Sequence, residues 1–193
     1  MSAFFLSGIF YTVFRTREYP LAAETEDGNA PPEKLNWMLT IRGIPKIYYS
    51  TEILMKNFKS PTDAEVRLDF PGGWPGDAVN KFTPTGRSAL ENNAYQYIRT
   101  LAQFRKSSSV LTTDKTMQYV VRDGVYICFR CDDRQIVKVI TNTGKIPFRA
   151  GWPFYKERIS GFSRASNIVT RQEFMLSDLT VPPGVSWVME LKK

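Results

Sequence analysis

The sequence contains no histidine, and this absence excludes several kinds of catalytic site. Serine or cysteine nucleophiles that rely on an imidazole base are excluded, and so are metal sites with histidine ligands. Chemistry carried by carboxylates remains open, because the chain has 19 Asp and Glu residues.

Cysteine is almost absent as well. Cys128 and Cys131 form a single Cys-x-x-Cys, so a tetrahedral zinc site would lack two ligands. A redox dithiol motif should open a helix, whereas this one ends a β-rich stretch and enters a polar turn. We therefore expect unbridged cysteines, one in a strand and one at its end, with no metal and no cofactor.

The sequence also lacks a hydrophobic run long enough to cross a membrane. Its most apolar stretch, residues 3–14, is shorter than the roughly 20 residues of a spanning helix. Positive charge follows this stretch, whereas in a secretory signal it precedes the apolar run. We expect no membrane partner, and either a displaced start or a partial element that packs on something absent. Leu21-Ala22-Ala23 is faintly similar to a cleavage site, which leaves a cytoplasmic and a periplasmic or secreted location open.

Charge is present in excess but is not concentrated. Lys and Arg outnumber Asp and Glu by 26 to 19, a net charge of +7 that raises nucleic acid or an anionic membrane as a partner. No block of like charges occurs, however, which argues against both partners. The prediction is a set of solvated basic side chains spread over alternating strand patterns: Arg122, Arg130, Arg134, Lys138, Lys145 and Arg149.

The first half of the chain predicts helix, strand and helix. Pro31-Pro32 suits a helix start, and Gly43 suits its end after Arg42. Residues 44–49 read as a short strand. Ser88 and Glu91 form a capping box that opens a second helix, which extends to residue 106. The irregular segment 50–87 between them is long enough to suggest a functional loop.

The second half predicts an antiparallel sandwich. After residue 110 the hydrophobic period changes to two, and turn residues recur about every ten residues. We expect this sandwich to be the stable unit, with a protease-resistant fragment that begins near residues 107–115. The expected strands are 117–122, 125–130, 135–141 and 185–192, with weaker ones near 146–148, 168–170 and 174–176.

Two segments resemble a known family. Residues 39–55 (LTIRGIPKIYYSTEILM) resemble the seventh helix and eighth strand of the α-amylase superfamily of retaining α-glucan hydrolases. Residues 67–77 (RLDFPGGWPGD) are similar to a loop of its neopullulanase and cyclomaltodextrinase branch. The resemblance implies an α+β chain: residues 1–109 would be the end of a (β/α)8 barrel, its last helix-strand-helix units, and residues 110–193 an antiparallel β-sandwich.

The same resemblance implies that the catalytic residues are missing. Retaining hydrolysis uses two carboxyl groups about 5 to 5.5 Å apart. In the family these groups lie on the fourth and fifth strands, and a third aspartate lies in an Asn-His-Asp motif after the seventh; all are upstream of the matched segments. We expect no catalytic residue in this chain, and a missing N-terminal barrel portion as a candidate partner. Ser50 stands where the family usually has glycine.

The resemblance also implies sugar contacts. Asp63 and Arg67 are similar to an Asp-x-x-x-Arg pair that contacts glucose hydroxyls, and Phe70 and Trp74 offer an apolar platform. Alternatively, Arg67 and Asp69 pin the loop and Trp74 packs beneath it. The candidate substrate-binding residues for an α-glucan or maltooligosaccharide are Asp63, Arg67, Asp69, Phe70 and Trp74.

Three functions fit this resemblance. The first is the C-terminal fragment of an α-glucan-hydrolysing glycosidase that is inactive alone. The second is an accessory module that binds α-glucan without catalysis. The third is a fragment that completes a site in trans with the rest of a barrel. In each case an isolated barrel end should leave a sheet edge and apolar helix faces uncovered.

Overall fold

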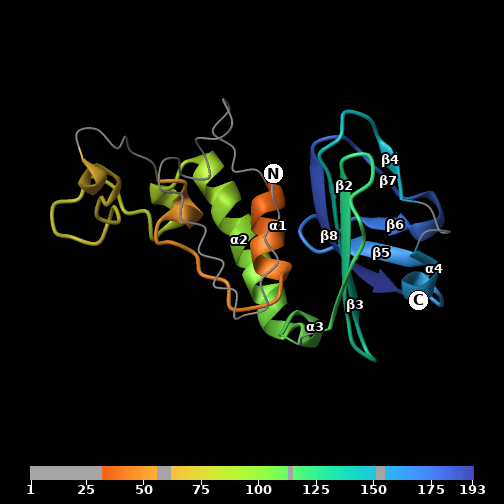
Figure 1. The fold of residues 1–193 in the computed structure, drawn as a ribbon. Coiled ribbons are helices and arrows are strands. Elements are labelled where there is room, and N and C mark those ends of the chain that lie inside the picture. The colour runs from red at the N-terminus through yellow and green to blue at the C-terminus, as the bar shows by residue number, and fades with distance from the viewer. Residues whose placement is uncertain (1–31, 56–61, 113–114, 151–154) are drawn as a thin grey trace.

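Helices lie on one side of an antiparallel sheet in this computed structural model, which describes residues 32–55, 62–112, 115–150 and 155–193 (Figure 1). The helical part contains α1 (Pro32–Thr40), α2 (Ala89–Ser107) and the short α3 (Ser109–Thr112). Single 3-10 turns occur at η2 (Thr51–Ile53), η3 (Asp63–Val66) and η4 (Pro84–Gly86). In the strand-rich part, α4 (Lys156–Ile159) and η6 (Leu176–Asp178) connect strands.

Both predicted helices form where their end signals place them. Glu91 N donates to Ser88 Oγ at 3.3 Å and Ser88 N donates to Glu91 Oε2 at 2.7 Å, which confirms the capping box of α2. Gly43, just beyond α1, has a φ of 102°, a conformation that favours glycine.

Two arginines from other elements donate hydrogen bonds to backbone carbonyl oxygens at the end of α1 and just after it. Arg105 in α2 donates to the carbonyl oxygens of Leu39, Ile41 and Gly43. Arg130 donates to that of Thr40. These bonds satisfy carbonyls that the end of a helix leaves open.

The main sheet has the strand order β1-β2-β3-β8-β5-β6 with antiparallel pairing throughout, and β4 pairs with β7 in a second sheet. The strands predicted at residues 125–130 and 135–141 both form, and they pair antiparallel with Cys131 opposite Ile136. The strands are β1 (Thr116–Gln118), β2 (Val125–Cys131), β3 (Ile136–Asn142), β4 (Phe148–Arg149), β5 (Arg164–Asn167), β6 (Glu173–Met175), β7 (Thr180–Val181) and β8 (Val185–Lys192).

Buried apolar side chains cover both faces of the main sheet. On one face Leu39 of α1, Leu101 of α2 and Leu111 of α3 pack against Val139 and Val188. The expectation that the helices leave their apolar faces uncovered is therefore wrong, because the sheet covers them.

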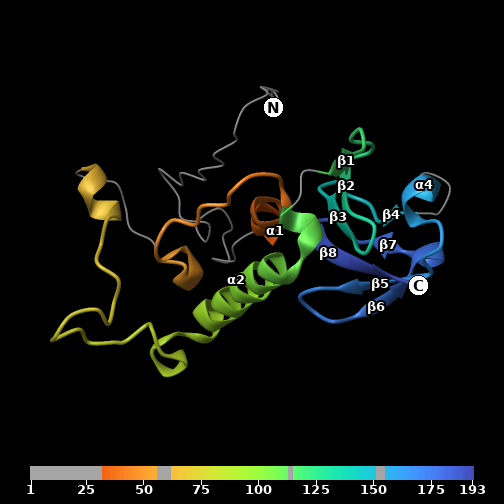
Figure 2. The same ribbon diagram turned by 90° about the horizontal axis from the view of Figure 1, so that it is seen from below.

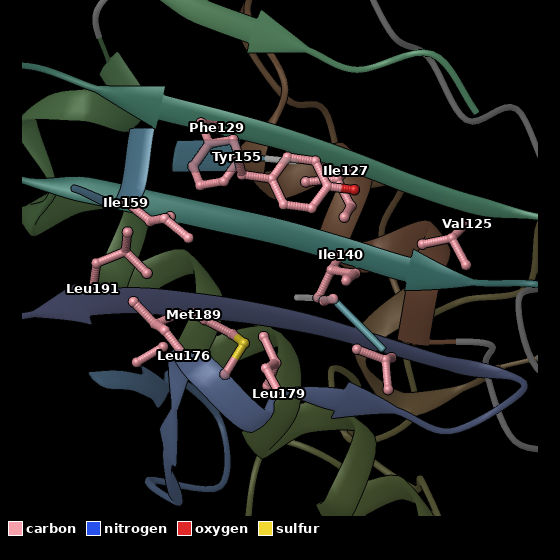
Figure 3. Packing of buried hydrophobic residues seen from close by; sticks show 13 residues of the cluster. Val125, Ile127, Phe129, Ile140, Tyr155, Ile159, Leu176, Leu179, Met189 and Leu191 are labelled. Atoms are coloured by element: carbon pink, nitrogen blue, oxygen red, sulfur yellow. The ribbon is translucent and has the colours of Figure 1, made fainter. Parts of the chain in front are cut away.

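The opposite face of the main sheet packs against the smaller sheet and the connecting turns (Figure 3). Phe129, Ile140 and Met189 come from the central strands, while Tyr155 and Leu179 come from the connections. The result is an antiparallel β-rich domain with few helices, as expected. The domain division at residue 110 stays a prediction.

Two predicted strands are wrong. Residues 44–49 contain no strand, and only Lys46 forms an isolated β-bridge. Residues 168–170 form a turn, and the strand lies earlier, at Arg164–Asn167. Here the Asn167 side chain accepts from the backbone N–H groups of Val169 and Thr170, which stabilises the turn.

Two of the basic side chains predicted to be solvated are fully buried, so that expectation is corrected for Arg130 and Lys138. Arg130 faces the helices. Lys138 lies between the sheets, with its Nζ 5.1 Å from the ring centroid of Tyr155 and 5.8 Å from that of Phe129. Alternation along a strand shows which residues share a face, but not that both faces of this sheet are covered.

The cysteines are free, as expected. Cys128 is buried on β2, and burial raises the pKa of its thiol to about 11. Among the helices of the described residues, none is long and apolar enough to span a membrane.

Candidate functional site

The predicted sugar-contacting residues lie on η3, which contains Asp63, and on the segment between η3 and α2. This yellow segment extends away from the helices and sheets in both views (Figures 1 and 2). Near its beginning the Tyr49 hydroxyl donates to the Leu68 carbonyl at 2.9 Å, which ties the segment to the chain that follows α1.

Asp77 holds the glycine-rich turn of this segment together. Its Oδ2 accepts from Trp74 N at 3.1 Å and from Gly72 N at 2.6 Å. These backbone hydrogen bonds lower the pKa of the Asp77 carboxyl below its ordinary value, and the bond from Trp74 has the largest effect. Gly72 has a φ of 102°, and a Cβ there would lie 2.6 Å from Asn80 Cα, so this position requires glycine.

A second set of contacts closes the loop behind this turn. The rings of Phe70 and Phe82 lie with centroids 4.3 Å apart, and Lys81 N donates to the Pro71 carbonyl at 3.0 Å. Residues 70–71, before Trp74, are therefore held against residues 81–82, after it.

The loop is fixed to the start of α2 by Arg87, which is buried. Its guanidinium donates to the carbonyls of Lys81 and Phe82 and to Asn92 Oδ1, and it lies 4.1 Å above the Tyr95 ring. Glu91 adds an ion pair with Lys81 at 2.5 Å. Partial burial raises the pKa of Glu91, but the bonds from Lys81 and Ser88 outweigh it and lower the pKa overall.

The predicted residues differ in how exposed their side chains are. Trp74 is 64% exposed, so it does not pack beneath the loop. Arg67 and Asp69 are exposed, and Phe70 is half-buried against Phe82. The side chain of Asp63 lies outside the part of the chain that the structure describes.

Sequence reasoning missed the residues that hold the loop, Asp77 and Arg87. Asp77 had a usable signal, because an aspartate shortly after a Gly-Gly pair commonly accepts backbone N–H bonds in a turn. Arg87 had none, because its partners are mainly backbone carbonyls.

This surface offers an exposed indole, a guanidinium and a carboxylate. An indole presents an apolar face, while a guanidinium donates hydrogen bonds and a carboxylate accepts them. Within the described residues no group of three or more His, Cys, Asp or Glu could hold a metal ion.

The comparisons with known proteins point to one family. Residues 116–190 match the model of the cyclo-malto-dextrinase C-terminal domain. A cyclomaltodextrin glucanotransferase of Klebsiella oxytoca is 32% identical over 107 residues, which is 55% of this chain and 15% of the relative.

Solved structures share the fold. The α-amylase of Geobacillus thermoleovorans complexed with acarbose matches with a TM-score of 0.62 and 15% identity, over 92% of this chain and 37% of its own. AmyP in complex with maltose matches with a TM-score of 0.61 and 14% identity, over 83% of this chain and 34% of its own. The chain therefore spans only a minor part of each relative's length.

The matched domain model, the glucanotransferase relative and the shared antiparallel fold agree with one another. Residues 116–190 therefore match a cyclomaltodextrinase-type C-terminal domain, and the chain is similar to the C-terminal part of α-amylase-family glycoside hydrolases.

Proposed function

We propose that this chain is the C-terminal portion of an α-glucan-hydrolysing glycosidase, that it contributes an α-glucan-contacting loop, and that it does not hydrolyse glucan alone. The observation that carries the proposal is the exposure of Trp74: the residue is 64% exposed, while Asp77 and Arg87 hold the loop around it by hydrogen bonds. A fixed and exposed aromatic ring can stack on a sugar without a large cost of ordering.

Two solved neighbours support the proposed substrate class. One solved neighbour holds acarbose and another holds maltose. The 1–109 segment would then be the end of a (β/α)8 barrel, with Asp63, Arg67, Asp69, Phe70 and Trp74 near the sugar. Of these residues, Arg67 and Asp69 carry exposed polar groups that can exchange hydrogen bonds with hydroxyls.

The lack of hydrolysis is supported by composition, because the chain has no histidine for the family's Asn-His-Asp motif. A retaining mechanism needs a pair of facing carboxyl groups, and no part of the loop described above supplies such a pair.

Affinity electrophoresis through gels that contain soluble starch tests the binding part of the proposal. We expect the chain to be retarded, and Trp74→Ala to lose most of that retardation. Val120→Ala is the matched control, because Val120 is a 94% exposed apolar residue on the β1–β2 hairpin, away from the loop. Unretarded migration of the unaltered chain, or equal retardation of Trp74→Ala, would refute the binding role.

A further inference from the structure

Arg158 in α4 donates hydrogen bonds to two sulfur atoms. Its Nε donates to Met117 Sδ at 3.0 Å, and its Nη1 donates to Cys131 Sγ at 3.7 Å. Thioether and thiol sulfurs are weak acceptors, whereas a guanidinium is a strong, charged donor. Arg87 and Arg105, by contrast, donate to backbone carbonyl oxygens. Within the described part of the chain the guanidinium of Arg158 therefore has acceptors weaker than those it can bind.

The two sulfurs lie on one face of the main sheet, at its edge. Met117 in β1 is opposite Phe129 in β2, and side chains two residues apart along a strand share a face, so Met117, Phe129 and Cys131 point to the same side. β1 is the outermost strand at this end of the sheet. Met117, Cys131 and Arg158 are all half-buried, so each is partly open to solvent.

Three other methionines provide a comparison. Met38 and Met189 are buried in the two apolar clusters, at 4% and 0% exposure, and Met175 is 53% exposed on β6. A sulfoxide at either buried position would place a polar oxygen among apolar side chains, and one at Met175 would be solvated. Only at Met117 does the structure hold a charged donor against a methionine sulfur among these four.

The chemistry that suits this arrangement is oxidation of the thioether by a hydroperoxide. The sulfur lone pair attacks one peroxide oxygen, the O–O bond breaks, and the other oxygen takes a proton and leaves as water or an alcohol. The sulfur loses two electrons to the peroxide and becomes a sulfoxide. The sulfoxide oxygen is a far better acceptor than the sulfur, and a hydrogen bond to it from the guanidinium is charge-assisted.

We infer that Met117 is a site of oxidation by hydroperoxides, and that Arg158 binds the sulfoxide oxygen and thereby ties β1 to α4 more firmly. Oxidation at this position would then stabilise the fold, whereas a sulfoxide in an apolar core disrupts it. This inference is independent of the proposed sugar contacts.

Hydrogen peroxide treatment followed by thermal unfolding tests the inference. Sulfoxides are mapped by mass spectrometry of the peptides, and unfolding is followed by circular dichroism. We expect sulfoxides at Met117 and Met175 and none at Met38 or Met189. Met117→Leu, oxidised in the same way, is the reference. Oxidation should shift the melting temperature of the unaltered chain upward by about 2 to 4 °C relative to the shift in Met117→Leu.

Three variants assign the shift. Arg158→Leu keeps an apolar stem but has no donor, so we expect it to lose the upward shift. Arg164→Leu, at an exposed position of β5, is the matched control and should keep it. Cys131→Ala should also keep it, because the inference places the oxygen on Met117.

Methionine sulfoxide reductase gives a reading on the unaltered chain that needs no variant. The reductase should return the melting temperature to its value before oxidation. Four outcomes would overturn the inference: Met117 stays unoxidised while Met175 reacts, oxidation of Met117 lowers the melting temperature, the upward shift persists in Arg158→Leu, or it is lost in Cys131→Ala. A shift that survives the reductase would also overturn it, since the oxygen would then lie on a cysteine.

Discussion

Asn36 in α1 and Ser186 in β8, 150 positions apart in the sequence, are joined by two hydrogen bonds. Asn36 Nδ2 donates to Ser186 Oγ at 3.0 Å and to Ser186 O at 3.1 Å. Tyr97 of α2 donates to Asn36 Oδ1 at 2.8 Å, and the hydroxyls of Thr141 and Ser186 lie 2.8 Å apart. This buried polar cluster joins both helices to the two central strands of the sheet.

Replacing Asn36 should therefore weaken the whole fold. Asn36→Ala removes three hydrogen bonds and leaves the Tyr97 hydroxyl without this acceptor, which we expect to lower the free energy of unfolding by about 2 to 3 kcal/mol. Urea denaturation at pH 7 measures the change. Asn93→Ala, at an exposed position of α2, is the control and should change stability little. A loss below about 0.5 kcal/mol for Asn36→Ala would mean that the cluster is energetically unimportant.

Because this cluster joins the helices to the sheet, we expect it to couple their unfolding. The sequence suggests that the sandwich after residue 110 is stable by itself, but the helices bury their apolar faces against the sheet. We expect helix and sheet to unfold in one transition, with far-UV circular dichroism and the fluorescence of the chain's tryptophans changing at the same urea concentration. Two separated transitions, or a protease-resistant fragment that begins at residues 107–115, would favour an independent sandwich.

Lys138 makes stability depend on pH. Burial lowers the pKa of its amine from 10.5 to about 8 in the folded chain. Below pH 8 both states are protonated and the full cost of burying the charge, about 3 kcal/mol, is present. Between pH 8 and 10.5 the unfolded chain keeps a proton that the folded chain has lost, so this contribution makes the fold more stable as pH rises.

A methionine at position 138 should remove this dependence. We expect Lys138→Met to be more stable than the unaltered chain at pH 7, with the difference shrinking towards pH 10. Denaturation series at several pH values measure it, and the subtraction cancels the titration of the tyrosines. Lys145→Met, at an exposed position, is the control. A difference that stays constant over this range would show that Lys138 titrates normally.

Ser50 is in a conformation better suited to glycine. Its φ is 64°, its side chain is buried, and its Oγ has no hydrogen-bond partner among the described residues. Ser50→Gly should therefore raise the free energy of unfolding by about 1 kcal/mol. Ser50→Ala removes the hydroxyl and keeps the backbone strain, so the difference between the two variants isolates the backbone contribution. A glycine variant that is less stable than the alanine variant would contradict this account.

The sequence predicts those elements whose signals are local. The capping box of Ser88 and Glu91 places the start of α2, and alternation places β2, β3 and β8 within one or two residues. Lys138 and Arg130 could not be recognised as buried, because their burial depends on what packs against each face of the sheet. Residues 44–49 have a strand-like composition, but only Lys46 forms a β-bridge. Trp74 was found through its resemblance to a family loop, whereas Arg87 acts through backbone carbonyls that no sequence pattern reveals.

The central proposal is that this chain is the C-terminal portion of an α-glucan-hydrolysing glycosidase and does not hydrolyse glucan alone. The most direct test incubates the purified chain with starch, pullulan and β-cyclodextrin and measures the release of reducing ends over time. The account predicts no release above that of a heat-denatured sample. Sustained release that scales with protein concentration would contradict it and would require a catalytic carboxyl pair within these 193 residues.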